Sequence, residues 1–235
     1  MTAGQALGVG VVLGLAAAVP IGPVNVELAR RTLTRGWAAG VALGLGAVSV
    51  DVAYAVLAVG LLGAGAAATG GVGEAAAAGG LAASPVVFWA LAPASVLLLS
   101  YLGGLSLRAA WAAWRGADRL SGAMSAAGTT SRLGRTYLTG LAMTAVNPMT
   151  VVFWFVTLPG QAVTRGVESA SLGYLAAGVF VGTVAWVLTF ATALAALGRW
   201  RRPWWEAAAD AVGGTLLLGF AALGVWAMAA RVFAA

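Results

Sequence analysis

The sequence predicts an all-α integral membrane protein with six transmembrane helices. Hydrophobic residues make up 61% of the 235 residues and charged residues only 9%, whereas soluble domains average about 45–50% apolar and about 25% charged residues. Six apolar segments each reach the length of about 20 residues that a spanning helix needs. The thirteen arginines stand in short clusters between these segments, as they do in proteins that use positive loops to set their orientation.

The six segments expected to span the membrane are 3–24, 37–62, 85–107, 137–158, 172–197 and 207–232. The first is not expected to be a cleavable signal peptide, because no basic region precedes it and two prolines interrupt its end. Residues 63–84 are rich in glycine and alanine and are expected to form an exposed loop or, in part, a short helix, and Trp111, Trp114 and Arg115 are expected to extend the third helix along the membrane interface. The domain organisation predicted is a first three-helix repeat (1–115), a cytoplasmic linker (116–135) and a second three-helix repeat (136–235).

The distribution of arginine predicts the orientation. Eleven of the thirteen arginines lie in the loops after segments one, three and five, and only Arg165 and Arg231 lie on the other side. Positive loops stay in the cytoplasm, so both termini are expected outside. Three helices in each half also make the second half enter the membrane from the opposite side, which is the parity of an inverted repeat. Similar openings of segments two (36–41) and five (173–179) support the repeat, although chance similarity between Gly/Ala-rich helices stays open.

Composition excludes several kinds of chemistry. The chain contains no lysine, histidine or cysteine. A zinc site of thiolates and imidazoles, a disulfide framework, a cysteine redox pair and a histidine base are therefore impossible. We expect no catalytic residues, no metal site and no cofactor. The net charge of +6 comes from the arginine clusters that orient the helices, so a nucleic acid is not an expected partner.

The first candidate site lies where segment one is interrupted, at Pro20, Gly22, Pro23 and Asn25. Two prolines and a glycine remove backbone donors and stiffness at or near membrane depth. Broken backbone is tolerated in a membrane only where it faces protein or a wet cavity. A helix that restarts there would present free N–H groups and the positive end of its dipole. Alternatively, the prolines end the first helix at the cytoplasmic surface.

The second candidate site lies about ten residues into segment four, at Asn147 and Pro148. Pro148 is expected to free the carbonyl of Thr144, four residues earlier, and Asn147 adds an amide near mid-membrane depth. The alternative is a proline kink satisfied by neighbouring threonines. Matched interruptions in corresponding segments of two halves are the best pointer in a sequence to the binding site of a transporter, and both halves carry one here.

Asp51 is the third candidate. It follows Trp37 by fourteen residues, which places it about 21 Å into helix two, inside a hydrocarbon core of about 30 Å. An ionisable residue at this depth is a functional hypothesis by default, with a helix-packing acceptor as the alternative. Glu27 is weaker, because Arg30 and Arg31 follow at i+3 and i+4 and a solvated helix pair is expected. The sequence leaves open whether Glu27 takes part in gating.

Glycine spacing indicates close packing between helices. Gly36, Gly40 and Gly44 form one stripe on helix two, and Gly213, Gly214 and Gly219 are expected to act similarly in helix six. These faces permit a homodimer without requiring one.

Several of these motifs together resemble the LysE/RhtB family of amino-acid exporters. The resemblance rests on the run 20–25, on Ala29-Arg30-Arg31-Thr32-Leu33, on Asp51, and on Tyr137-Leu138-Thr139-Gly140-Leu141 followed by Asn147-Pro148 and Phe153-Trp154. Val24 and the pair Ser49-Val50 depart from the common pattern, which puts the identity of the substrate in doubt. The resemblance implies a multi-pass protein of the bacterial inner membrane that exports amino acids or related solutes, driven by the proton gradient or the membrane potential.

The function expected from these features is a secondary exporter of small zwitterionic solutes. Pro20, Gly22, Pro23, Asn25, Thr144, Asn147 and Pro148 are expected to shape the substrate site. Asp51 is expected to couple protons or to bind the substrate ammonium. The expected partners are an amino-acid-like substrate, protons and the lipid bilayer. Two alternatives from other classes are a membrane enzyme acting on lipid, for which no convincing catalytic pair exists, and a non-transporting partner subunit.

Overall fold

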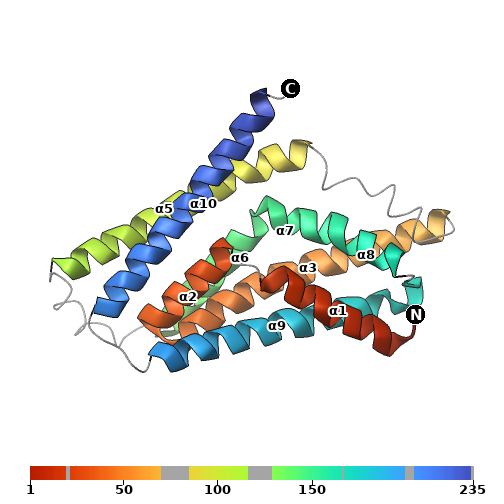
Figure 1. Cartoon of the computed structure of the whole chain (residues 1–235). Coiled ribbons are helices and arrows are strands. Elements are labelled where there is room, and N and C mark those ends of the chain that lie inside the picture. Colours follow the sequence, from red (N-terminus) through yellow and green to blue (C-terminus); the bar gives the residue numbers. More distant parts are fainter. Residues whose placement is uncertain (20–21, 70–84, 116–128, 166, 199–203, 234–235) are drawn as a thin grey trace. The chain divides into compact units, whose positions relative to one another are not determined.

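Every element that the structure describes is helical (Figure 1). The structure is a computed structural model that describes residues 1–19, 22–69, 85–115, 129–165, 167–198 and 204–233. The elements are α1 (Ala3–Ala18), α2 (Pro23–Arg35), α3 (Trp37–Thr69), α5 (Pro85–Trp114), α6 (Thr129–Ala145), α7 (Pro148–Val152), the π-helix η4 (Phe153–Thr157), α8 (Leu158–Thr164), the 3₁₀-helix η5 (Ser169–Ser171), α9 (Leu172–Leu197) and α10 (Trp204–Phe233). The predicted all-α class is confirmed.

Four helices are individually long and apolar enough to cross a membrane. Their spans are Trp37–Ala68, Trp89–Trp114, Leu172–Leu197 and Trp204–Phe233. Two interrupted pairs, Ala3–Ala18 with Pro23–Arg35 and Arg132–Ala145 with Pro148–Ala162, pass the same test when each pair counts as one span, which gives up to six. Within the described residues four to six spans are thus found where six were expected, and the helices after the two breaks start at Pro23 and Pro148.

Each helix that follows a break begins at a proline. Pro23 and Pro148 occupy the first helical positions of α2 and α7. A proline suits this position because its missing N–H would have no intrahelical partner there and its fixed φ favours the helix.

Three helices extend beyond their expected spans, and the extension of α5 was predicted from the sequence. Helix α3 continues to Thr69 and α5 to Trp114, and α6 already begins at Thr129. Of the two alternatives for residues 63–84, an exposed loop or in part a helix, the helix is found at residues 63–69. Alanine has the highest intrinsic helix propensity, and the alanines between 64 and 68 extend α3 into this segment.

The chain forms two compact units. Unit 1 comprises residues 1–20, 48–91 and 144–186, and unit 2 comprises residues 21–47, 92–143 and 187–235. Each unit has its own core of buried side chains.

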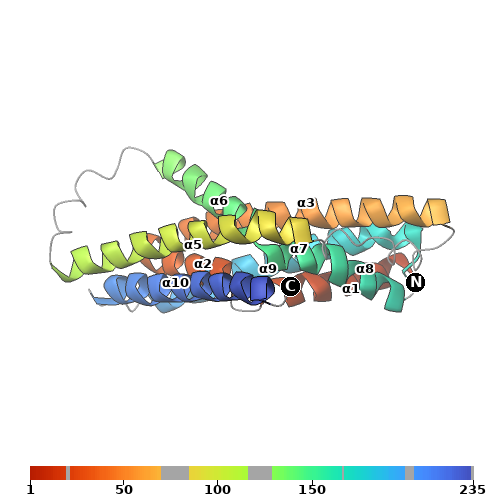
Figure 2. The same cartoon turned by 90° about the horizontal axis from the view of Figure 1, so that it is seen from above.

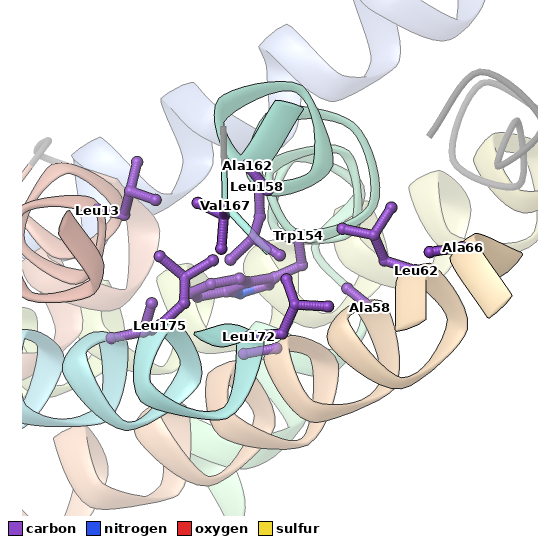
Figure 3. Packing of buried hydrophobic residues seen from close by; sticks show 12 residues of the cluster. Leu13, Ala58, Leu62, Ala66, Trp154, Leu158, Ala162, Val167, Leu172 and Leu175 are labelled. Carbon is purple, nitrogen blue, oxygen red and sulfur yellow. The ribbon is translucent and has the colours of Figure 1, made fainter. Parts of the chain in front are cut away.

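Unit 1 packs around Trp154, which is fully buried. Figure 3 shows its ring among Ala58 of α3, Leu158 of α8, and Leu172 and Leu175 of α9. Helix α1 approaches α9 so closely that a Cβ at Gly10 or at Gly178 would meet backbone atoms of the other helix. Glycine is required on both sides of this contact, as in other close helix pairs of membrane proteins.

Unit 2 contains a second contact of the same kind. A Cβ at Gly46 of α3 would meet the carbonyl of Tyr137 on α6, and a Cβ at Gly140 of α6 would meet the carbonyl of Leu43 on α3. Helices α5 and α10 lie side by side in Figure 1 and Figure 2, and Gly103 and Gly214 make their contact close.

The stripes expected from glycine spacing are partly confirmed. Gly40 and Gly44 pack tightly against α2 and α9, and Gly213 packs against Arg30. The prediction was wrong for one end member of each stripe, Gly36 and Gly219. Gly36 ends α2 with a positive φ of 91°, a conformation that glycine adopts readily. No described atom lies within 4 Å of a Cβ built at Gly219.

Candidate functional site

Asp51 is held in unit 1 by a tryptophan from a distant part of the chain. The indole Nε1–H of Trp154 donates a hydrogen bond of 2.9 Å to Asp51 Oδ1. The carboxyl group lies well inside the apolar span of α3, and the ring of Trp154 fills the core of unit 1. Tryptophan suits this position because its large apolar ring can be buried while its N–H finds a polar partner.

The break in span four lies beside this pair. Helix α6 ends at Ala145, and Asn147 caps α7 by accepting a 3.1 Å bond from the N–H of Met149 through its side-chain oxygen. The Asn147 N–H donates to the carbonyl of Thr144 at 3.2 Å. The prediction that Pro148 frees the Thr144 carbonyl was therefore wrong, because the turn at the break supplies a new donor to that carbonyl.

A π-helix follows the break and carries Trp154. In η4 the N–H of Leu158 bonds to the carbonyl of Phe153, five residues earlier. Pro159 has no N–H to donate to the carbonyl of Phe155, so the regular helical ladder cannot continue there. Single π-helical turns of this kind occur frequently at functional sites.

Tyr54 makes a second link between α3 and the broken segment. Its hydroxyl donates a 3.0 Å bond to the carbonyl of Ala145, at the end of α6, and its ring packs against Phe155 with centroids 5.8 Å apart. Tyr54 follows Asp51 by three residues and so lies on the same face of α3. One face of α3 thus binds both sides of the break.

Thr144 contributes a buried hydroxyl group to the same region. Its side-chain oxygen has no hydrogen-bond partner, although the residue is only 3% exposed. A buried hydroxyl without a partner costs about 1–3 kcal/mol. Such a group in a native structure calls for an explanation, and a polar solute that enters beside the break would supply the missing partner.

The predicted site residues fall into two groups. Thr144, Asn147, Pro148 and Asp51 belong to unit 1, where two hydrogen bonds join α3 to the broken segment. Gly22, Pro23 and Asn25 belong to unit 2, at the start of α2, with Asn25 buried. Pro20 lies outside the described residues. Tyr54 was not predicted; its position three residues after Asp51 was the only signal in the sequence.

The prediction of a solvated pair at Glu27 was wrong. Glu27 is completely buried, and Arg30 and Arg31 are 7% and 6% exposed. The i+3 and i+4 spacing correctly indicated that the three charges meet. Their burial depends on α10, which is distant in sequence and packs over them. Asp210 on α10 joins this network through Arg30.

The network has the geometry of strong ion pairs. Arg30 binds the Glu27 carboxylate with two bonds of 2.7 Å, from Nε and Nη2. Arg31 Nε donates to Glu27 Oε1 at 2.6 Å, and Arg30 Nη1 donates to Asp210 Oδ1 at 2.5 Å. Glu27 thus accepts three charge-assisted bonds, which are about twice as strong as neutral ones. In the part of the chain that the structure describes, no three carboxylates gather as metal ligands would.

A comparison with known protein families identifies the family of this chain. Residues 15–226 match the family described as LysE type translocator. The chain belongs to this family. The match covers all the helices that carry the candidate residues, and it confirms the resemblance recognised in the sequence. The LysE-type chain is therefore a membrane transporter, from a family of translocators and not of enzymes. Neither a curated protein nor a solved structure gives a significant match.

Proposed function

We propose that this LysE-type protein exports amino acids or related small zwitterionic solutes, driven by the proton gradient or by the membrane potential. The observation that carries the proposal is the carboxyl group of Asp51 inside an apolar span, bound by Trp154 beside a broken helix. Ionisable residues inside spans are rare and mark the paths of substrates and ions. Helices interrupted in this way line the sites of secondary transporters.

The groups in unit 1 offer one charge that matches an amino acid, the carboxylate of Asp51 for the substrate ammonium. Trp154 occupies one oxygen of Asp51, and the other can accept a bond from a substrate ammonium or carry a proton. A proton and an ammonium group compete for the same carboxylate, so a single side chain can exchange one for the other. The hydroxyl of Thr144 and the backbone of the break add polar groups for the remainder of the solute.

The test is solute flux in proteoliposomes. The purified protein is reconstituted into vesicles that are loaded with a mixture of radiolabelled amino acids. Efflux of the amino acids is then measured with and without an imposed pH gradient or a potassium-diffusion potential. Efflux of at least one amino acid that responds to one of these gradients is expected. Equal efflux from protein-free vesicles for every amino acid would contradict the proposal.

We infer that the halves 1–115 and 136–235 are inverted repeats; of the expected linker 116–135, residues 129–135 belong to α6. The corresponding elements are α1–α2 with α6–α8, α3 with α9, and α5 with α10. The close glycine contact of α3 with α6 in unit 2 then has its counterpart in that of α9 with α1 in unit 1. The division into units also exchanges corresponding pieces, because α1 and the start of α9 belong to unit 1 whereas α6 and the start of α3 belong to unit 2. Both observations support the repeat.

The repeat and the arginine distribution together favour a bacterial inner-membrane protein with both termini outside. In this cysteine-free chain, a cysteine at Thr2 or Ala170, both exposed, is expected to react with a membrane-impermeant maleimide in whole cells. A cysteine at Gly134, where added atoms meet no neighbour, is expected to react only after the cells are opened. The opposite pattern would reverse the orientation.

A further inference from the structure

The buried charges of unit 2 form a network that joins two helices through a single contact. Glu27, Arg30 and Arg31 all lie on α2 and bind one another, whereas Asp210 is the contribution of α10. Within the network α2 carries a net charge of +1 and α10 a charge of −1. The Arg30–Asp210 bond is therefore the electrostatic link between the helices, and the side chain of Asp210 is 14% exposed, more than its three partners.

Stability alone is a weak explanation for this network. Removing charged groups from water costs several kcal/mol per ion, and apolar side chains of similar volume often replace buried ion pairs without loss. The network nevertheless lies in tight packing, since Gly213 leaves space for the methylene groups of Arg30 that any larger residue would fill. Helix α10 therefore packs directly against the side chain of Arg30, with Gly213 on its methylene groups and Asp210 on its guanidinium group.

Separating the Arg30–Asp210 pair exposes one donor site and one acceptor site of opposite charge. The Glu27 bonds stay intact, because they lie within α2. A zwitterion restores both interactions when its carboxylate takes the place of Asp210 on Arg30 and its ammonium pairs with Asp210. An amine or an acid alone would leave one buried charge unpaired, which is strongly unfavourable.

We propose that the Arg30–Asp210 ion pair is a gate in unit 2 that zwitterionic solutes open by replacing the pair. This proposal rests on the proposed function, because it identifies the class of solute that the transporter admits. Asp210 determines specificity through its charge, and Arg30, held by Glu27 and Arg31, presents the fixed half of the gate. The bond between α2 and α10 closes again when the solute leaves.

The test uses a reporter cysteine on α10. Ala207 is 4% exposed and precedes Asp210 by three residues, on the same side of the helix. In Ala207→Cys protein in proteoliposomes, the rate of maleimide labelling reports opening. Adding Asp210→Asn is expected to raise this rate about five-fold or more, and Asp210→Glu is expected to keep it low. Glu206→Gln, which removes an exposed carboxylate from the same helix, is the matched control.

Solutes provide the second arm of the test. A mixture of amino acids is expected to accelerate labelling of Ala207→Cys, whereas propionate or propylamine at the same concentration is not. The gate would be overturned if Asp210→Asn and Glu206→Gln gave the same rate of maleimide labelling per folded molecule. Asp210→Asn would then differ only in a lower melting temperature. Amino-acid efflux in the flux assay without faster labelling by the mixture would also overturn the gate. Absence of any efflux would instead count against the proposed function, so the two failures are distinguishable.

Discussion

Replacing Asp51 by asparagine is expected to abolish uphill export while the protein still folds and inserts. Asparagine has nearly the same size and keeps an oxygen that can accept the bond from Trp154 Nε1. It can neither bind a proton nor balance the charge of an ammonium group. Flux in proteoliposomes should therefore fall to the background of empty vesicles and lose its response to an imposed pH gradient.

A second substitution separates charge from packing. Trp154→Phe removes the N–H donor and leaves most of the apolar ring in the core around it. We expect this variant to retain pH-responsive flux at a reduced level, because the carboxyl group of Asp51 is still present.

Wild-type flux in Asp51→Asn would assign Asp51 a packing role only and leave proton coupling without a candidate among the described residues.

Replacing Gly178 by valine is expected to remove most of the folded protein. A Cβ at this position would meet the backbone of Leu7, Gly10 and Val11 on α1, and a helix backbone cannot yield as a flexible side chain can. Overpacking a core typically costs about 1–3 kcal/mol. Because the added atoms would meet the backbone of α1, this site is expected to lie at the upper end of that range. The amount of monodisperse protein and its melting temperature in detergent are the measurements.

Gly173→Val is the matched control for this prediction. It introduces the same side chain into the same helix, where a Cβ meets nothing within 4 Å. The difference between the two variants therefore reports mainly the contact with α1. Equal yields and melting temperatures would show that α1 does not pack against α9 at Gly178.

The sequence was sufficient for features that depend on local chemistry. Apolar length fixed the spans, and Pro23 and Pro148 marked where helices restart, because proline acts on the backbone of its own neighbourhood. Asp51 could be placed inside α3 by counting residues, since the rise of a helix is constant. The family could be recognised because its motifs lie around these same breaks.

Partners far along the chain could not be predicted in the same way. Trp154 lies 103 positions from Asp51, and Asp210 lies 180 positions from Arg30, so no spacing rule connects them. The burial of Glu27 depends on α10 covering α2, and helix periodicity says nothing about which other helix does so. The π-helix also escaped prediction, because Pro159 changes the ladder in a segment whose composition is that of an ordinary span.

The two units differ in chemistry although their glycine contacts correspond. Unit 1 holds an acid and an indole, whereas unit 2 holds two arginines and two acids. In an exporter made of identical inverted halves, the inward-open and outward-open states would have equal free energy, since a two-fold rotation about an axis in the membrane plane converts one into the other. Unequal polar centres remove that degeneracy. In the proposed exporter, the resting protein would then favour either the inward-open or the outward-open state, and a solute or a proton would shift the equilibrium by binding the two states with different affinity.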